Sequence, residues 1–343
     1  MTGLKRFGVV VGCLLVLGVI YQQWAERRDN ARFPAPGRMI AVGEHRLHLW
    51  CTGHGHPIVM LLSGDGTPSV TMYAAQSRIA TFTTACSYDR AGLGWSDPPP
   101  RPMGLVEQVR DLQHIVRNGG LTGPFVLVPE SGGTLIALSF FERSPGSVAG
   151  MVSVDGSEPD LWFRGSPDEF PSMRLMDPVW QAGWHLGVVR LMLPFAVPPW
   201  VQSLPPRLRR QFDTVWSRAM PSYARDAIDR WEQTAVADRP TITAGAWGRR
   251  PIILLRHGLP GGMGVPKRYE AEWPAAQAKL ATLSADSTTI IAKDNHHPIA
   301  EENPALVSDQ VRRIVTTLRA QASSSTPPPP PARPSTAAPD TSP

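Results

Sequence analysis

The feature that most constrains this chain is an apolar run that ends in a single serine and continues as a helix-like segment. Residues 126–133 read Val-Leu-Val-Pro-Glu-Ser-Gly-Gly, and the mainly apolar residues 134–138 follow at once. A serine at a sharp strand-to-helix turn projects its hydroxyl, because small neighbours let the two elements close around it. Turns also collect serine and glycine for backbone reasons alone. Ser131 is therefore a candidate nucleophile whose role depends on partners elsewhere in the chain.

A nucleophilic serine requires a base, and a third group must hold that base in one tautomer. The histidine pair His296 and His297 follows the β-rich run 288–292 and supplies a candidate base. Asp155 directly follows the strand-like run 151–154, whereas no carboxylate follows the strand-like run 251–255 before Glu270. An aspartate at a strand end often caps a turn. Because the candidate nucleophile and base require a third, acidic group, we interpret Asp155 as that acid.

The order Ser131, Asp155, His297 along the chain is that of the α/β-hydrolase fold, and the chain resembles this family over roughly residues 33–320. The resemblance rests on a strand pair in 34–50, the loop 87–97, the turn 129–133 and the histidine loop 297–307. It implies a mostly parallel, eight-stranded sheet flanked by helices, with a helical lid inserted after strand 6. It also implies that His297 is the catalytic histidine and that His296 lines the pocket. The family usually has glycine two residues before the serine, where this chain has Pro129.

The resemblance further implies an oxyanion hole with two backbone donors. One is the N–H that follows the nucleophile, on Gly132, and the other lies in the loop after the third strand, on Asp65. A carboxylate that points into such a hole opposes the negative charge of a tetrahedral intermediate. We therefore expect the Asp65 side chain to point outward or to pair with a neighbour such as Arg90.

The chain divides by composition into five segments. These are an N-terminal membrane anchor or signal with linker (1–32), a first part of the hydrolase core (33–158), a helical lid (159–249), a second part of the core (250–320) and a disordered Pro-rich tail (321–343). Seven of the eleven tryptophans lie in the lid, which reads as helices at 178–193, 206–220 and 222–236. Most of these tryptophans are expected to pack against the body. Because pockets are lined mainly by apolar and aromatic side chains, the lid favours a small hydrophobic ester as substrate.

The N-terminus has the pattern of an export or anchor signal. Lys5 and Arg6 precede the uncharged run 7–21, and no Ala-x-Ala cleavage site follows. The missing site favours a membrane-anchored, extracytoplasmic protein over a secreted one. Basic residues flank the run on both sides, so the sequence leaves the orientation open.

Cys51 and Cys86 are the two cysteines outside that run. In the resembling family the second strand lies antiparallel beside the fourth, which would bring these two residues together. A disulfide between them fits an oxidising compartment, and two small buried thiols are an equally good interpretation.

Other classes of site receive little support. Metal-like spacing occurs in His45, His48, Cys51, His54 and His56, but strand alternation separates these residues and no metal site is predicted. The net charge of +5 comes from scattered arginines rather than a basic patch, so no nucleic-acid partner is expected. Dinucleotide and phosphate-loop motifs are missing from the sequence, so no cofactor is expected.

The leading hypothesis is a serine hydrolase that cleaves a hydrophobic carboxylic ester through an acyl-enzyme. An acyltransferase or an amidase would use the same three residues. A non-catalytic binding protein that has the hydrolase fold is the third hypothesis, and Pro129 is its main support.

Overall fold

The computed structural model describes residues 2–101, 103–164, 178–179, 181–195, 197, 201–202, 204–217, 239–261 and 267–325. Within these residues eight strands form one sheet in the order β1-β2-β4-β3-β5-β6-β7-β8. β2 pairs antiparallel with β1 and with β4, and all other neighbours are parallel. The strands are β1 (Arg38–Ala41), β2 (Arg46–Thr52), β3 (Val59–Leu62), β4 (Ala85–Tyr88), β5 (Phe125–Pro129), β6 (Val148–Val154), β7 (Ile252–His257) and β8 (Ser287–Ala292). The mostly parallel, eight-stranded sheet predicted from the sequence is confirmed.

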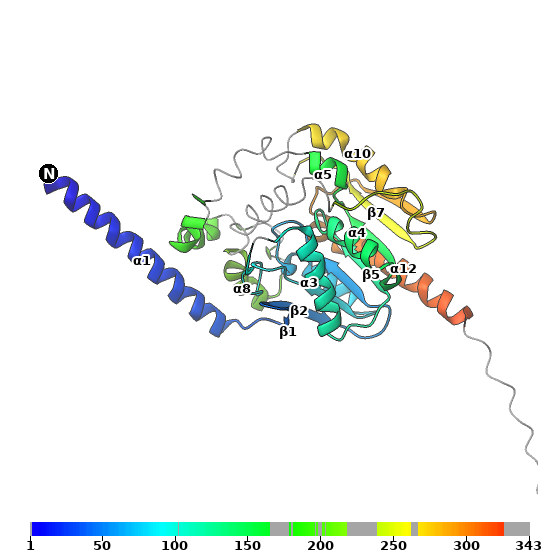
Figure 1. The fold of residues 1–343 in the computed structure, drawn as a ribbon, viewed down its shortest axis with the longest axis horizontal. Coiled ribbons are helices and arrows are strands. Elements are labelled where there is room, and N and C mark those ends of the chain that lie inside the picture. The colour runs from blue at the N-terminus through cyan, green and yellow to red at the C-terminus, as the bar shows by residue number, and fades with distance from the viewer. Residues whose placement is uncertain are drawn as a thin grey trace, which may run out of the picture.

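Helices cover both faces of this sheet (Figure 1). One apolar cluster joins the sheet to α3, α4 and the end of α10, and a second joins it to α2, α11 and α12. Strands β3 and β5 are buried along their whole length, which explains why residues 125–129 are apolar without alternation. The helices of the body are α2 (Tyr73–Ile79), α3 (Leu105–Asn118), α4 (Gly133–Arg143), α10 (Lys267–Ala281), α11 (Ile299–Glu302) and α12 (Pro304–Ser325), with short 3-10 helices η1 (Ser69–Met72) and η2 (Pro145–Ser147).

Only part of the predicted lid belongs to the described residues. It contains α5 (Pro159–Arg164), α7 (Val188–Met192), η4 (Leu193–Phe195) and α8 (Pro206–Ser217). Buried side chains of α8 pack against Val70 and Trp95, which lie in the loops after β3 and β4. The predicted helix 222–236, three of the lid tryptophans (Trp180, Trp200 and Trp231) and the tail from residue 326 lie outside the described residues.

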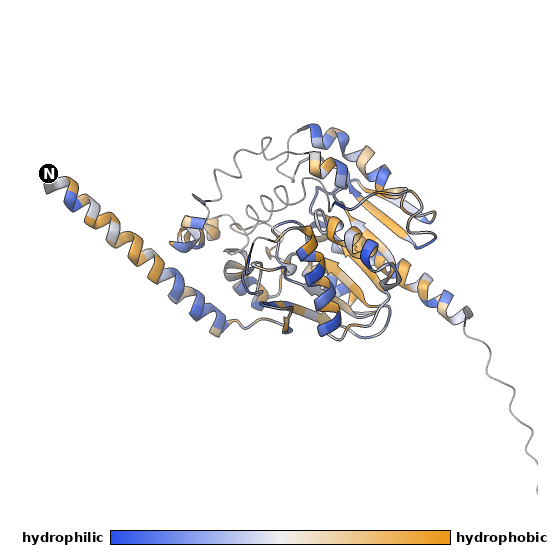
Figure 2. Ribbon diagram, in the orientation of Figure 1, coloured by the Kyte–Doolittle hydropathy of each residue, from blue (hydrophilic) through white to orange (hydrophobic). Residues whose placement is uncertain are grey.

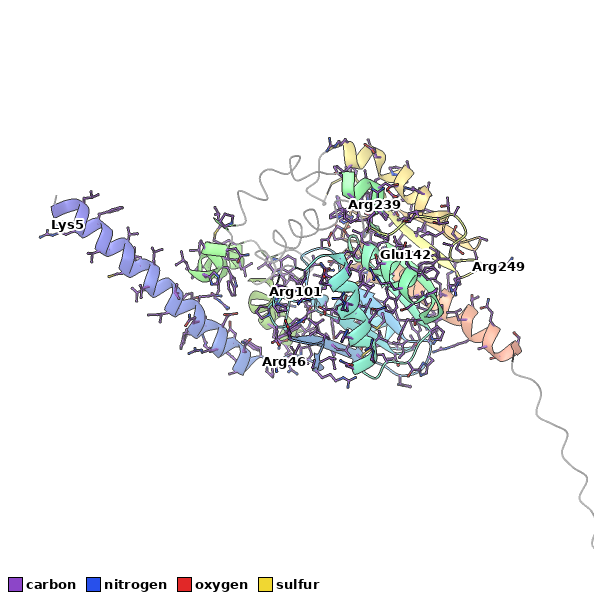
Figure 3. The ribbon with its side chains drawn as sticks, in the orientation of Figure 1. Lys5, Arg46, Arg101, Glu142, Arg239 and Arg249 are labelled. Atoms are coloured by element: carbon purple, nitrogen blue, oxygen red, sulfur yellow. A yellow bond between two sulfur atoms is a disulfide. The ribbon has the colours of Figure 1, made fainter. Side chains whose placement is uncertain are left out.

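A long helix, α1 (Thr2–Arg32), extends away from the body (Figure 1). Residues 3–32 are long and apolar enough to cross a membrane, with a mean hydropathy of 2.0 over the best window, and none of that window is buried. Figure 2 shows the helix hydrophobic towards its N-terminus and hydrophilic towards the body. Lys5 lies at the outer end of the helix, whereas the other labelled charged residues lie on the body (Figure 3). The uncharged run seen in the sequence is thus one part of a 31-residue helix.

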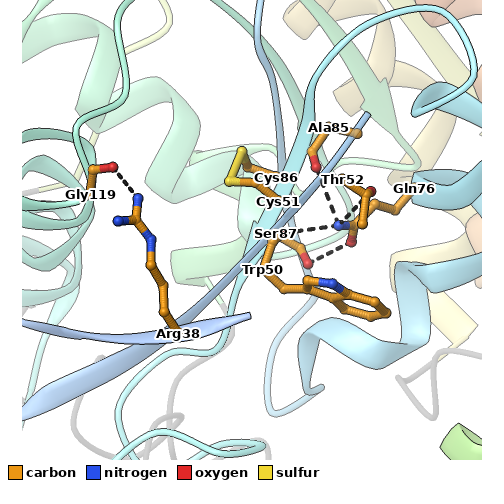
Figure 4. The surroundings of a disulfide bond; sticks show 9 residues. All are labelled: Arg38, Trp50, Cys51, Thr52, Gln76, Ala85, Cys86, Ser87 and Gly119. Atoms are coloured by element: carbon orange, nitrogen blue, oxygen red, sulfur yellow. Dashed lines mark hydrogen bonds between the residues drawn. A yellow bond between two sulfur atoms is a disulfide. The ribbon is translucent and has the colours of Figure 1, made fainter. Parts of the chain in front are cut away.

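Cys51 of β2 and Cys86 of β4 form a disulfide (Figure 4). The two residues are directly opposite in the antiparallel pairing of these strands, which brings their Cα atoms to 4.0 Å. Gln76 of α2 reinforces the same place, because its side-chain amide donates to the carbonyl oxygens of Trp50 and Ala85 at 2.9 and 3.3 Å. The pairing that the family resemblance suggested for these cysteines is confirmed.

Candidate active site

Ser131 stands at the turn between β5 and α4, at the carboxyl end of the sheet. Its φ is 48°, a conformation that non-glycine residues rarely adopt and that costs roughly 1–3 kcal/mol. The turn closes tightly, since the carbonyl oxygen of Leu62 leaves no room for a Cβ at Gly133. A Cβ at Gly64 would lie only 3.3 Å from the Cβ of Ser131. The positive φ of Ser131 and the two glycines beside it thus let the strand and the helix close around the serine hydroxyl, as in a nucleophile elbow.

Pro129 fits this turn through an interruption of the sheet. The pairing of β5 with β6 runs to Leu127, and an isolated bridge joins Glu130 to Val154 beyond it. The backbone N–H of Ser131 then donates to the carbonyl oxygen of Val154 at 3.1 Å. Because proline has no N–H to give, the ladder passes over this position without a buried donor left unpaired.

Asp155 and His297 lie within hydrogen-bond distance of each other and of the serine. His297 Nδ1 is 2.6 Å from Asp155 Oδ2, and His297 Nε2 is 2.9 Å from Ser131 Oγ. Asp155 directly follows β6 and has a φ of 47°, while His297 lies in the loop between β8 and α11. Three residues 24 to 166 positions apart in the chain thus form one hydrogen-bonded line, with the imidazole in the middle. This arrangement allows the serine proton to pass to an imidazole that a carboxylate orients.

A second imidazole binds the same carboxylate. His257, the last residue of β7, donates its backbone N–H to Asp155 Oδ1 at 3.1 Å, and its Nδ1 lies 2.6 Å from Asp155 Oδ2. Trp273 of α10 donates its indole N–H to Asp155 Oδ1 at 2.8 Å. The other nitrogen of His257 lies 3.1 Å from Glu270 Oε2. A neutral imidazole has one N–H, so a ring that faces two carboxylates through both nitrogens is satisfied best as an imidazolium.

These contacts set the charges of the site. Burial alone would raise the pKa of Asp155, but its hydrogen bonds with His257 and His297 outweigh burial and lower the pKa to about 2. Burial opposes the charge on His257 as well, yet Asp155 and Glu270 raise the pKa of this imidazole above its usual value. Asp155 is therefore a fully buried anion that accepts four hydrogen bonds, which leaves it little freedom to turn away from His297.

The structure corrects the expected orientation of Asp65. This residue is only 9% exposed, and its carboxylate lies against Gly132, where it fills the space of a Cβ. Arg90 donates to the carbonyl oxygens of Ser63 and Gly64, which belong to the same loop as Asp65. The two residues predicted as oxyanion donors, Gly132 and Asp65, are thus neighbours, and the Asp65 carboxylate packs against Gly132.

Two further carboxyl groups lie behind the turn. Glu130 is buried and accepts from the backbone N–H of Ala300 at 3.3 Å. Burial and the nearby Glu301 raise its pKa well above the usual value, and burial raises the pKa of Glu301 to about 7. The pair connects the residue before the serine with the helix after the histidine, and a shared proton removes the repulsion between the two groups.

His296 has a different place from the one that the resemblance implied. Its backbone N–H donates to Glu302 Oε2 at 2.7 Å, its Nδ1 lies 3.1 Å from Glu302 Oε1, and its side chain is 46% exposed. The glutamate at the end of α11 thus holds this partly exposed ring. His296 caps the histidine loop and leaves His297 to face Ser131.

One group of described residues has the spacing of a metal site. The ligand atoms of Asp155, His257 and His297 all lie within 4.8 Å of one another. Each atom already takes part in the hydrogen bonds described above, which account for the cluster without an ion. Two residues of the metal-like spacing at positions 45–56 have other partners. Cys51 forms the disulfide, and His48 binds Asp89.

A cavity of about 780 Å³ lies between the end of α1, the loop after β4 and the lid. Trp95 and Trp184 contribute aromatic surface, and Arg46, Asp97 and His185 contribute polar groups. The three hydrogen-bonded residues are not part of its lining. Two of the lid tryptophans have different environments. Trp184 lines this cavity, whereas Trp247 is buried in the body and stacks on Phe141, with the ring centroids 4.1 Å apart.

Sequence reasoning overlooked three residues of the site, His257, Glu270 and Trp273. His257 is the last residue of β7, and a histidine at a strand end carries no sequence signal for a contact with a distant aspartate. Glu270 lies in α10, well beyond the end of that strand. From that helix Glu270 and Trp273, three residues apart on one face, reach back to His257 and Asp155.

Comparisons with known proteins agree with this architecture. No protein-family model matches the chain. A probable transporter of Hormonema carpetanum is 21% identical over 314 residues, which cover 82% of this chain and 43% of the relative. An uncharacterized protein of Schizosaccharomyces pombe is 27% identical over 230 residues, which cover 63% of this chain and 38% of the relative. The chain therefore spans about two fifths of the length of these curated relatives.

Solved structures give a closer likeness in shape. A thermophilic esterase of Thermogutta terrifontis superposes with a TM-score of 0.60 at 22% identity, covering 83% of this chain and 99% of the esterase. A haloalkane dehalogenase of Bradyrhizobium elkanii gives 0.61 at 18% identity over 84% and 98% of the two chains. An enol-lactonase of Burkholderia xenovorans gives 0.61 at 15% identity over 81% and 100%. This protein therefore has the fold of the α/β hydrolases.

Proposed function

We propose that this protein is a membrane-anchored serine hydrolase that cleaves hydrophobic carboxylic esters through an acyl-enzyme. The observation that carries the proposal is the imidazole of His297, which lies between Ser131 Oγ at 2.9 Å and Asp155 Oδ2 at 2.6 Å. The positive φ of Ser131 and of Asp155 supports it, because backbone strain in non-glycine residues clusters at functional sites. The solved structures of similar fold include an esterase and an enol-lactonase, which favours acyl chemistry.

In the proposed reaction, Ser131 Oγ attacks the ester carbonyl carbon and its proton passes to His297 Nε2. The backbone N–H groups of Gly132 and Asp65 hold the resulting oxyanion. His297 then gives the proton to the alkoxide of the leaving alcohol as the carbon–oxygen bond breaks, which leaves an acyl group on Ser131. A water molecule repeats the sequence, with His297 as base, and releases the acid. Asp155 keeps its charge throughout and stabilises the imidazolium.

The anchoring and location belong to the same proposal. The length and hydropathy of α1 support a single membrane-spanning helix. A signal sequence that is later removed from a secreted protein has the same features. The Cys51–Cys86 disulfide supports an oxidising, extracytoplasmic compartment for the body. A lid with apolar and aromatic residues beside such an anchor favours esters with lipid-like acyl groups over charged metabolites.

One observation favours a second candidate, a non-catalytic binding protein with the same fold. The carboxylate of Asp65 lies against Gly132, the residue whose N–H is proposed to hold the oxyanion. A site that holds a carboxylate there is less suited to an oxyanion unless the side chain moves or takes up a proton. An acyltransferase or amidase would share the first half of the mechanism and differ in the acceptor or the leaving group.

The experiment that separates these candidates is hydrolysis of an ester series of increasing acyl length by the full-length protein in detergent. We expect turnover that rises with acyl length in the wild type and falls to background in Ser131→Ala. Ser139→Ala is the matched control, because Ser139 is a buried serine of the helix that follows the turn and is expected to keep full activity. Folded wild-type protein without turnover on any ester, amide or acyl-acceptor pair would favour the binding protein.

A further inference from the structure

The lid carries an exposed apolar surface beside α1. Outside α1, seven large apolar side chains of the described residues are exposed, and five of them lie between residues 179 and 195. We call these five the lid patch: Val179 (56% exposed), Val188 (44%), Leu191 (60%), Met192 (58%) and Phe195 (92%). The other two, Leu259 and Ile291, lie apart on the body. Such a concentration on one short segment is typical of an interaction surface.

The lid patch lies next to the end of the apolar part of α1. A Cβ at Gly18 would be 2.8 Å from the carbonyl oxygen of Leu186, and a Cβ at Gly187 would be 2.7 Å from the ring of Tyr21. Tyr21 is the last residue before the polar pair Gln22 and Gln23, so these contacts lie where a membrane-spanning helix would emerge from the bilayer. Figure 1 shows the corresponding green segment beside α1.

Polar contacts fix which side of the lid segment faces α1. Arg190 forms an ion pair with Asp29 and hydrogen-bonds Gln22, and its side chain is only 9% exposed. Val189 is buried as well, at 5% exposure. Arg190 of α7 therefore faces α1, whereas Val189 is buried beside Gly183 of the lid segment itself. Leu191 and Met192 are left facing outward, although nothing in that packing requires apolar residues there.

We propose that the lid patch inserts into the surface of the lipid bilayer that α1 spans. The proposal rests on the membrane anchoring proposed above and goes beyond it, because it assigns a second, independent lipid contact to the lid. The continuity of the patch with the apolar surface of α1 selects the bilayer rather than a protein partner. Trp24 of α1, 55% exposed, and Phe195 provide aromatic rings of the kind that settle at the membrane interface. The lid is thereby held on the bilayer.

The depth of the lid patch in a membrane tests the proposal without any activity measurement. In full-length protein with Cys13→Ser, which removes the free exposed cysteine, a single Leu191→Cys is labelled with an environment-sensitive fluorophore. The matched control is Ile291→Cys, at another exposed apolar residue, on β8. Both proteins are reconstituted in phosphatidylcholine vesicles with nitroxide on part of the acyl chains. Insertion to a depth of about 5–10 Å predicts a blue-shifted label at 191 that the lipid nitroxide quenches, and no such change at 291.

Several results would overturn the proposal. An unquenched label at position 191, or equal quenching at 191 and 291, means that the patch does not lie in the bilayer. A blue shift at 191 that grows with protein concentration and occurs without lipid quenching means that the patch meets a second copy of the chain.

A second variant links the contact to catalysis. Leu191→Glu with Met192→Glu should lower hydrolysis of a long-chain ester embedded in vesicles by about tenfold, because two charges now face the interface. Hydrolysis of a short, water-soluble ester should stay the same. If the wild type hydrolyses neither ester, the proposed function fails while the quenching result still decides the lid contact. If both esters are affected equally, the substitutions act on the site and the proposed role of the patch in delivery is wrong.

Discussion

Three histidines of this protein bind an aspartate through Nδ1 and differ in what their Nε2 faces. His48 lies 2.8 Å from Asp89, while His257 and His297 each lie 2.6 Å from Asp155. The Nε2 of His48 faces the carbonyl oxygen of Pro36, that of His257 faces the carboxylate of Glu270, and that of His297 faces the hydroxyl of Ser131. The aspartate–histidine pair is common to all three places, so the pair by itself does not make a catalytic site. The group beyond the second nitrogen decides what each imidazole does.

The pair at Asp89 and His48 has the features of a structural contact. Both side chains are completely buried, and Asp89 also accepts from the backbone N–H groups of Ser69 and Trp95 at 2.6 and 3.1 Å. Burial would raise the pKa of Asp89, but the hydrogen bond with His48 and these N–H groups lower it. The aspartate thus fixes the loops after β3 and β4. By contrast, the His297 side chain is 14% exposed and reaches a residue that can react.

The same substitution at both aspartates tests whether the two aspartate–histidine pairs have different roles. Asp155→Asn should lower kcat of the folded fraction by about 10,000-fold, because the imidazole loses its orientation and its counter-charge. Asp89→Asn should instead cost roughly 3 kcal/mol of folding free energy and leave kcat of the folded fraction unchanged. Ester turnover and thermal unfolding of both variants provide the test.

Glu158→Gln is the control for the acid, since Glu158 is a buried carboxylate three residues after Asp155 that binds Lys279 and the backbone of Leu161. It is expected to keep its turnover. Equal, small losses of turnover in Asp155→Asn and Glu158→Gln would show that the acid has been placed wrongly.

Asp65 allows the electrostatics of the oxyanion site to be tested. Asp65→Asn removes a negative charge beside Gly132 while it keeps the size of the side chain. We expect kcat/KM for esters to rise by about tenfold, because a charge that opposes the oxyanion in a partly buried site is lost. A fall in kcat/KM would mean that the carboxylate itself contributes to the reaction.

Glu270 distinguishes the second imidazole from the first. The pKa of His257 is raised in the folded protein, so its ion pairs stabilise the fold fully below the unfolded value of about 6.5, and this contribution is lost as the pH rises through the folded pKa. Glu270→Gln should therefore lower the free energy of unfolding by roughly 1 kcal/mol at pH 6 and have no effect at pH 9. Thermal unfolding as a function of pH measures this difference. A loss that is the same at both pH values would assign Glu270 a packing role alone.

The smallest expected effect concerns the carboxyl pair behind the turn. Because burial raises the pKa of Glu301 to about 7, the folded state holds a proton that the unfolded state releases, and stability falls as the pH rises from about 4.5 to 7. Glu301→Gln removes this penalty and should stabilise the protein by roughly 1 kcal/mol at pH 8 and by nothing at pH 4. Chemical unfolding at the two pH values is the measurement. A variant that is less stable at pH 8 would show that the charged pair is tolerated.

The sheet and the hydrogen-bonded residues Ser131, His297 and Asp155 could be predicted from the sequence because both depend on local patterns. The buried strands before Ser131 and Asp155 are continuous apolar runs, and each ends in a residue whose chemistry differs from the run. The fold resemblance then supplied the spatial order of strands that were far apart in sequence. The same order placed Cys51 beside Cys86 and left a disulfide and two buried thiols equally open, and the structure shows the disulfide.

The remaining features depend on how side chains approach one another in space. His257 binds Asp155 across 102 positions of sequence, and no periodicity encodes such a contact. The inward turn of Asp65 arises from the close approach of its loop to Gly132, which only the tertiary packing sets. The exposure of Leu191 and Met192 likewise follows from the way α7 docks on α1.

The most direct test of the central claim is the site and rate of covalent labelling by a fluorophosphonate. Peptide mapping of the full-length protein should place one adduct on Ser131, and the labelling rate should fall by at least about a thousandfold in His297→Ala. Adding Ser131→Ala should abolish the adduct. Folded protein that forms no adduct, or an adduct on Ser131 whose rate is the same with and without His297, would contradict the account.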